Sequence, residues 1–449
     1  MGIFKAYDIR GIYVARATGP DELDEELARK IGRATAQFLG AKKMVVSRDM
    51  RLSSPSISEA TIQGILEAGS DAVDIGLAST PGNYFATANY GFDGGLQITA
   101  SHNPKEYNGF KVSGHEASPI GEETGLPEIE RIATSGKFEP AAKKGSVSKK
   151  DIAADYKKHI LKFAEDIAPL KLVIDAANGM GGLEIPLIFD QLPCQTIPLY
   201  FELDGTFPNH EANPLKYENL RDLRARVKEA KADLGVALDG DCDRCAYIDE
   251  RGEIISSDLI TALIAREVLA KEPGARIIYD VRSSWAVKEE IERSGGIPLK
   301  GRVGHAFMKA ALREKSAAFA GELSGHYYFR DNFYCDSASI GLIKVLNLLS
   351  KAERPISEII APLNRYFATG EINFEVEDKA AMIMELTRKF SDGKQDFMDG
   401  ITVEYEDWWF NVRQSHTEPL LRLNLEGRTR ELMEEGKQKL ISLLGKPVE

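Results

Sequence analysis

The feature that most constrains the fold is a pattern of strands and helices that occurs three times. Each time, an apolar strand is followed by a helical segment and later by another apolar strand that ends in polar residues. These ending strands span residues 95–98, 233–238 and 317–320. Strands that alternate with helices predict α/β units, and open α/β sheets bind ligands at the carboxyl ends of their strands. The repeats are unevenly spaced, which favours three related domains over a solenoid.

The chain has 449 residues, enough for several such domains. Residues 137–150 show no periodicity and mix Pro, Ala, Gly, Ser and Lys, which indicates a boundary. Beyond residue 366 the repeat gives way to short strands and an amphipathic helix over residues 430–444. We therefore expect an α/β protein with three related α/β domains with mixed sheets around a central cleft, plus a smaller C-terminal α+β domain. The expected bounds are 1–150, 151–252, 253–366 and 367–449.

The charge and the apolar runs exclude several classes of protein. The net charge of −12 argues against binding to nucleic acid or to a membrane surface. No apolar run is long enough for a membrane span, and the first residues lack the apolar core of a signal peptide. The four cysteines fit a reducing compartment, and we interpret Cys242 and Cys245 as an incidental pair, because a zinc site needs a second pair. We expect a cytoplasmic monomer or homodimer whose partners are small molecules.

Ser101 lies in the polar loop Thr99-Ala100-Ser101-His102-Asn103-Pro104, directly after the strand at residues 95–98. This is where an open α/β sheet places a ligand. Seen alone, the loop is equally well a polar turn. Adjacent side chains diverge, so we do not expect His102 to act as a simple base for Ser101, and the sequence has no G-x-S-x-G elbow.

Three aspartates, Asp239, Asp241 and Asp243, follow the strand at residues 233–238. Side chains at alternate positions of an extended chain point the same way, so these carboxylates can converge on one cation, and their hard oxygen ligands suit Mg²⁺. An EF-hand is disfavoured because Arg244 stands where its loop needs glycine. A solvated acidic turn remains an alternative. Arg244 beside the aspartates can stabilise charge on a phosphoryl group.

Three further segments have groups suited to anions or sugars. Arg413-x-Ser415-x-Thr417, with Arg422 in the next strand, predicts a phosphate clamp of hydroxyls, turn N–H groups and guanidinium groups. Glu322 and Ser324, in a loop bounded by glycines, can bind sugar hydroxyls. Arg10, followed by Gly11, can approach an anion closely. Each of these segments, taken alone, is also compatible with an ordinary surface turn.

Five motifs resemble those of the α-D-phosphohexomutase family, and most closely its phosphomannomutase/phosphoglucomutase branch. They occur in the family's order and span nearly the whole chain. The motifs are Ala6-Tyr7-Asp8-Ile9-Arg10-Gly11, Thr99-Ala100-Ser101-His102-Asn103-Pro104, Asp239-Gly240-Asp241-x-Asp243-Arg244, Gly321-Glu322-x-Ser324-Gly325-His326 and Arg413-x-Ser415-x-Thr417-Glu418-Pro419.

The resemblance implies that Ser101 is a phosphoserine whose phosphate completes the metal site. Lys111 and Arg10 would assist proton transfer and stabilise the phosphoryl group. The implied metal ligands are Ser101, Asp239, Asp241 and Asp243. The implied catalytic residues are Ser101, Arg10, Lys111 and His102. We add Arg244 to them because it can stabilise charge on a phosphoryl group. The implied substrate-binding residues are Tyr7, Arg282, His305, Glu322, Ser324, His326, Arg413, Ser415, Thr417 and Arg422.

Two positions depart from the family's pattern. His416 replaces the usual Asn or Gly of the clamp, which affects the expected geometry there. Cys242 replaces a Gly or an aromatic residue between the aspartates, and we expect its side chain to point away from the metal.

The resemblance implies a Mg²⁺-dependent phosphomannomutase that also acts as a phosphoglucomutase. It would interconvert hexose 6-phosphate and α-hexose 1-phosphate through a hexose 1,6-bisphosphate, which also serves as activator. Mannose 1-phosphate would then feed the synthesis of GDP-mannose. The alternatives within the class are a strict phosphoglucomutase and a phosphoglucosamine mutase. The alternatives outside it are an inactive homologue that binds sugar phosphates and a metal-dependent phosphatase.

Overall fold

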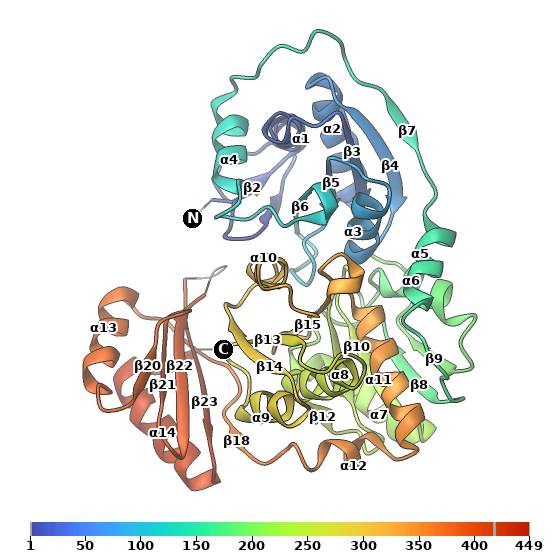
Figure 1. The fold of residues 1–449 in the computed structure, drawn as a ribbon. Helices are drawn as coiled ribbons and strands as arrows, with labels where there is room; N and C mark the ends of the chain where they lie inside the picture. The colour runs from blue at the N-terminus through green and yellow to red at the C-terminus, as the bar shows by residue number, and fades with distance from the viewer. Residues whose placement is uncertain (1, 416–418, 449) are drawn as a thin grey trace.

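The computed structural model describes residues 2–415 and 419–448, which form four β-sheets, each from one consecutive stretch of chain (Figure 1). We call the sheets with their helices units I (residues 9–149), II (153–255), III (257–360) and IV (367–448). Figure 1 shows unit I at the top, units II and III together below it, and unit IV at the left. None of the described helices is both long and apolar enough to cross a membrane.

Unit I has a seven-stranded mixed sheet in the order β2-β1-β6-β5-β3-β4-β7. The strands are β1 (Ile9–Tyr13), β2 (Glu22–Leu23), β3 (Lys43–Arg48), β4 (Asp71–Leu77), β5 (Gly94–Ile98), β6 (Tyr107–Gly114) and β7 (Val147–Lys149). The helices are α1 (Glu25–Leu39), α2 (Ser54–Glu67), α3 (Thr80–Asn89) and α4 (Leu126–Ser135). Strand β7 pairs with β4, so the end of the segment that we interpreted as an irregular boundary belongs to this sheet.

Units II and III have five-stranded mixed sheets, in the orders β12-β11-β10-β8-β9 and β14-β13-β15-β16-β17. Unit II contains β8 (Lys171–Asp175), β9 (Gln195–Leu199), β10 (Leu234–Leu238), β11 (Cys245–Ile248), β12 (Ile254–Ile255), α5 (Ala153–Leu161), α6 (Gly181–Phe189) and α7 (Arg221–Ala230). Unit III contains β13 (Arg276–Asp280), β14 (Ile297–Gly301), β15 (Phe319–Gly321), β16 (Tyr327–Phe329), β17 (Cys335–Asp336), α8 (Ser257–Lys271), α9 (Trp285–Arg293), α10 (His305–Lys315), α11 (Ala338–Ala352) and α12 (Ile356–Ile360).

The three units share one strand order, which accounts for the repeated sequence pattern. The shared orders are β4-β3-β5-β6, β9-β8-β10-β11 and β14-β13-β15-β16. In each, three parallel strands are followed by one antiparallel strand. The loop between the third parallel strand and the antiparallel strand therefore holds an equivalent place in all three units. The expected fold class of three related α/β domains and a smaller C-terminal domain is confirmed.

Unit IV is smaller and has an antiparallel sheet in the order β20-β21-β22-β23-β19-β24, with β18 paired to β23. Its elements are β18 (Phe367–Ala368), β19 (Ile372–Phe374), β20 (Lys394–Asp396), β21 (Ile401–Glu404), β22 (Trp408–Gln414), β23 (Leu421–Gly427), β24 (Pro447–Val448), α13 (Lys379–Lys389) and α14 (Arg430–Leu444). Its buried residues form a separate hydrophobic core. By contrast, one core runs through units II and III and reaches Val45 and Phe85 of unit I.

Candidate active site

Three equivalent loops meet at the centre of the molecule: β5–β6 with Ser101, β10–β11 with the aspartates, and β15–β16 with Glu322. The Ser101 hydroxyl donates a hydrogen bond to Asp239 Oδ2 at 2.8 Å, which joins units I and II. Arg244 and His326 form an antiparallel bridge between the backbones of units II and III. The topology thus explains why segments more than 80 residues apart contribute to one site.

Ser101 is fully buried and has a positive φ of 49°. Its Oγ accepts a hydrogen bond from Arg244 Nη2 at 3.3 Å and lies 3.2 Å from His102 Nδ1. Our expectation that the two adjacent side chains diverge is therefore wrong, because a left-handed backbone at Ser101 turns them toward one another. Burial and the Arg244 guanidinium lower the pKa of His102 well below its usual value. A neutral His102 accepts from Arg244 Nη2 at 2.5 Å, which suits an orienting role better than that of a base.

Asp239, Asp241 and Asp243 are fully buried, and each offers a carboxylate oxygen within 4.8 Å of the others. A solvated acidic turn is therefore excluded. The aspartates converge through a tight turn rather than the extended chain that we expected, since Cys242 has a φ of 63°. Cys242 itself belongs to the hydrophobic core.

This acidic cluster fits a divalent cation. Burial and the neighbouring Asp243 and Asp241 raise the pKa of Asp239 well above its usual value, a penalty that a bound cation would relieve. Asp241 Oδ1 and Asp243 Oδ1 accept no hydrogen bond from the described residues. Three carboxylates with free oxygen lone pairs and a neighbouring hydroxyl are a ligand set that suits Mg²⁺.

Lys111, in β6, lies against the same carboxylates. Its ammonium group donates to Asp241 Oδ2 at 2.7 Å and to Asp243 Oδ2. Burial disfavours the charged lysine, but the three aspartates outweigh it and raise the pKa of Lys111 above its usual value. Thr80, at the start of α3, also donates to Asp241 Oδ2, at 2.6 Å, so this oxygen accepts hydrogen bonds from both Lys111 and Thr80.

Arg10, in β1, lies beside the Ser101 loop. Its guanidinium donates to Asn103 Oδ1 at 2.5 Å and is held by Asp8, with Nη2 and Oδ2 2.7 Å apart. His305, which packs edge-on against Tyr7 at 5.0 Å between ring centroids, lies 3.9 Å from the same Asp8 oxygen. Burial and the positive charge of Lys309 lower the pKa of His305 to about 4, so the ring is neutral.

Glu322 and Ser324, in the β15–β16 loop, are held by hydrogen bonds. Glu322 Oε1 accepts a hydrogen bond from the Gly304 N–H at 2.9 Å, and Oε2 accepts one from the Tyr328 hydroxyl. Ser324 Oγ is 2.9 Å from His326 Nδ1. This loop therefore presents a carboxylate, a hydroxyl and an imidazole, groups that can bind sugar hydroxyls.

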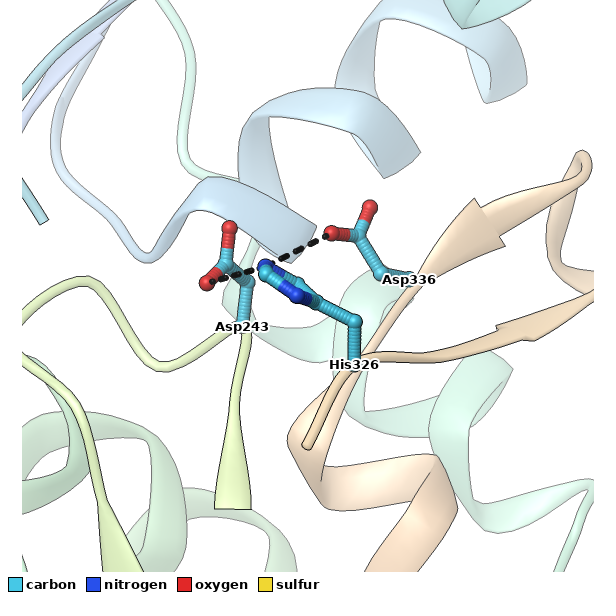
Figure 2. A group of neighbouring side chains, drawn as sticks. All are labelled: Asp243, His326 and Asp336. Carbon is cyan, nitrogen blue, oxygen red and sulfur yellow. Dashed lines mark ion pairs between the residues drawn. The ribbon is translucent and has the colours of Figure 1, made fainter. Parts of the chain in front are cut away.

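His326 also lies between two carboxylates (Figure 2). Its Nε2 is 3.5 Å from Asp243 Oδ1 and 3.8 Å from Asp336 Oδ2. These three residues form a second group with ligand atoms close enough to hold a metal ion. However, the buried Lys309 ammonium lies 3.6 Å from Asp336 Oδ1 and already supplies a positive charge there. We therefore interpret Asp336 as a residue that orients His326.

The residues of the predicted phosphate clamp lie in unit IV. Arg413 in β22 and Arg422 in β23 are directly paired across the two strands, and Ser415 follows β22. Thr417 and His416 lie outside the described residues. Arg282 of unit III reaches the same place, because its Nη1 and Arg413 Nη2 both contact Glu371 Oε2, at 3.3 and 3.2 Å.

Asp49, Arg51 and Asp280 were not predicted from the sequence; together with Arg282, which was expected to bind substrate, they form a repeated Asp-x-Arg. Asp49-x-Arg51 follows β3, and Asp280-x-Arg282 ends β13, the equivalent strand of unit III. In both, the backbone N–H of the arginine donates a hydrogen bond to Oδ1 of the aspartate, at 3.0 and 2.7 Å. Arg51 is buried and donates to four carbonyls of the Ser101 loop, those of Ser101, Asn103, Pro104 and Tyr107. The strand-end rule that identified the other loops applies here too, and it would have found Asp49, Arg51 and Asp280.

Models of four protein domains match consecutive parts of the chain. Residues 1–140, 154–252 and 256–366 match the alpha/beta/alpha domains I, II and III of phosphoglucomutase/phosphomannomutase, and residues 371–443 match its C-terminal domain. The matched order is that of units I to IV.

The chain is also similar to whole proteins. It is 40% identical to a phosphomannomutase of Vibrio cholerae over 99% of this chain and 98% of the relative, and 39% identical to one of Escherichia coli K12 over 98% of each. A crystal structure of a phosphoglucomutase/phosphomannomutase family protein from Burkholderia thailandensis superposes with a TM-score of 0.90, at 35% identity and over 98% of this chain and 96% of that one. The Paramecium parafusin structure shares the fold, with a TM-score of 0.76 at 17% identity over 98% and 94% of the chains. The chain therefore belongs to the α-D-phosphohexomutase family and is a mutase.

Proposed function

We propose that this mutase interconverts mannose 6-phosphate and mannose 1-phosphate, and the corresponding glucose phosphates, through a phosphoryl group carried on Ser101. The observation that supports this most strongly is the surroundings of the Ser101 hydroxyl. It lies, fully buried, between the carboxylate of Asp239 at 2.8 Å and the guanidinium of Arg244 at 3.3 Å. A metal site on one side and a fixed cation on the other suit transfer of a phosphoryl group.

In the first half-reaction, the bond between phosphorus and Ser101 Oγ breaks and a new bond forms to O1 or O6 of the hexose phosphate. The hydroxyl proton passes to a basic group of the cleft, and Ser101 Oγ regains a proton when its phosphate has left. Arg244 and Arg10 stabilise the charge on the transferring oxygens. The second half-reaction returns the opposite phosphate of the hexose 1,6-bisphosphate to Ser101.

Asp239, Asp241, Asp243 and a phosphate oxygen on Ser101 would hold Mg²⁺. When bound, the ion would draw negative charge from the phosphoryl group during transfer. Lys111 forms ion pairs with two of these carboxylates, those of Asp241 and Asp243, so it fixes their orientation and balances part of their charge.

The sugar must present either of its ends to Ser101, so the remaining residues have to bind two orientations. Arg413, Ser415, Thr417 and Arg422 hold the phosphate that is not transferred, and Arg282 contributes from unit III. Glu322 and Ser324, with His305 and His326 beside them, bind the sugar hydroxyls. Closure of unit IV over the cleft keeps the bisphosphate from water.

The test is a comparison of initial rates on mannose 1-phosphate and glucose 1-phosphate, with Mg²⁺ and catalytic glucose 1,6-bisphosphate. A Ser101→Ala preparation is the blank. Similar kcat/KM for both sugars is expected, with no activity in the blank. A large preference for one sugar would contradict the dual specificity. Release of free phosphate without a 6-phosphate product would favour a phosphatase, and binding without turnover an inactive homologue.

A further inference from the structure

The predicted phosphate clamp already contains an anion of the protein's own, the carboxylate of Glu371. Its Oε2 lies 3.2 Å from Arg413 Nη2 and 3.3 Å from Arg282 Nη1, and its Oε1 lies 3.1 Å from Arg422 Nη1. Asn424 Nδ2 approaches Oε2 at 3.5 Å. One carboxylate therefore contacts three arginines, from units III and IV together.

The backbone explains why an anion is needed at this place. Arg413 and Arg422 are directly opposite one another in the antiparallel pair of β22 and β23. Like charges in that relation repel and destabilise a sheet. Glu371 directly precedes β19, which pairs with β23, so the start of this strand brings its carboxylate to the two guanidinium groups.

The chemistry of these arginines suits a phosphate as well as a carboxylate. Arg282 has its own partner in Asp280, with Nη2 and Oδ2 2.7 Å apart. Glu371, which contacts Arg413 and Arg422 as well as Arg282, carries one negative charge. A phosphate monoester dianion carries two negative charges and accepts the same charge-assisted hydrogen bonds from arginine, so it can take the place of the carboxylate.

The exposure of the side chains shows that an incoming ligand meets Glu371 and Arg422 before the two buried arginines. The Glu371 side chain is 25% exposed and that of Arg422 is 20% exposed, whereas those of Arg413 and Arg282 are 2% and 5% exposed. The three guanidinium groups outweigh the effect of burial and lower the pKa of Glu371 to about 2, so the carboxylate stays charged at any physiological pH. Gly370, with a φ of 70°, provides a turn directly before it.

We propose that Glu371 is a built-in competitor of the substrate phosphate: it occupies the clamp when no substrate is bound and must leave the arginines when phosphate enters. This inference builds on the proposed function, in which the clamp holds the phosphate that is not transferred. Glu371 joins unit IV to unit III through its ion pair with Arg282, and it also contacts Arg413. When phosphate displaces Glu371, the two units are joined through the bound phosphate instead.

The test measures the binding of inorganic phosphate to the full chain by titration calorimetry. Glu371→Gln keeps the size of the side chain and removes its charge. We expect this variant to bind phosphate at least about tenfold more tightly than the wild type. The matched control is Glu375→Gln, four residues further on and exposed, which changes the net charge equally and is expected to bind within about twofold of the wild type.

A second comparison assigns the gain to the clamp. In an Arg413→Met background, Glu371→Gln is expected to give no tighter binding, since the two changes act on the same pair. Unchanged or weaker phosphate binding by Glu371→Gln alone would overturn the proposal and make Glu371 a group that orients the arginines. Phosphate binding requires no turnover, so this result stands apart from the mutase assay: the order of affinities can hold even if the proposed reaction fails.

Discussion

Replacing Arg51 by methionine is expected to damage both the stability of the protein and the function of Ser101. Arg51 is buried with Asp49, with its Nε 3.2 Å from Asp49 Oδ2, and neither side chain is exposed. Its guanidinium also donates to four carbonyls of the Ser101 loop, at 2.7 to 3.0 Å. Phe207 and Gly205 of unit II cover it: the Phe207 ring centroid is 5.0 Å away, and a Cβ on Gly205 would lie 2.6 Å from Arg51 Cα.

The magnitude follows from these contacts. Removing one partner of a buried ion pair costs about 3–5 kcal/mol, because the other charge is left uncompensated. The loss of the carbonyl partners adds to this, so Arg51→Met should lower the free energy of unfolding by about 4 kcal/mol or more, a large part of the ~5–15 kcal/mol typical of a domain. The double variant Asp49→Asn/Arg51→Met removes both charges and should recover about half of that loss.

Two assays separate stability from positioning. Urea unfolding followed by circular dichroism gives the free energies. Intact-protein mass spectrometry gives the rate at which glucose 1,6-bisphosphate phosphorylates Ser101. The double variant should be stable enough to study yet phosphorylated at least about a hundredfold more slowly, because the loop has lost its four anchoring hydrogen bonds. Phosphorylation of the double variant at the wild-type rate would refute the reasoning, as would a wild-type stability for Arg51→Met.

Three further expectations follow from the geometry of the site. In Gly240→Ala the new Cβ would lie 2.4 Å from the Ser101 carbonyl oxygen, so initial rates should fall at least about a hundredfold while the far-ultraviolet dichroism stays unchanged; a wild-type rate would contradict this. His305 is neutral in the fold with a pKa of about 4, so acid favours the unfolded chain. The free energy of unfolding should therefore fall by about 3 kcal/mol between pH 6.5 and pH 4. Urea unfolding of His305→Gln at the same pH values should show a smaller fall of this free energy with acid. Chelation should abolish activity, Mg²⁺ should restore it, and Asp239→Asn should raise the Mg²⁺ concentration for half-maximal rate at least about tenfold; an unchanged requirement would exclude Asp239 as a ligand.

Much of the site could be predicted because its residues follow a local rule. Ser101, Asp239 and Glu322 come directly after apolar strands, and the carboxyl ends of such strands lie at one edge of a sheet. Their shared position in three repeated units then brings the loops together. The sequence shows this pattern without any knowledge of long-range contacts.

Glu371 and Asp336 were missed because their place in the site depends on how strands pair. Glu371 reaches the clamp only because β19 pairs with β23, and Asp336 reaches His326 only through the pairing of β16 with β17. A lone acidic residue in such a segment looks like any exposed one in the sequence. The contact between Ser101 and His102 was mispredicted for a different reason, since a positive φ at a serine is unusual and residue spacing gives no sign of it.

The central claim is that Ser101 passes a phosphoryl group to a hydroxyl of a hexose phosphate. The most direct measurement mixes the enzyme phosphorylated at Ser101 with mannose 6-phosphate and Mg²⁺ and follows a single turnover by mass spectrometry. The account predicts that the protein loses one phosphoryl group as mannose 1,6-bisphosphate appears, without free phosphate. Loss of the phosphoryl group as free phosphate, at the same rate with and without the sugar, would contradict it.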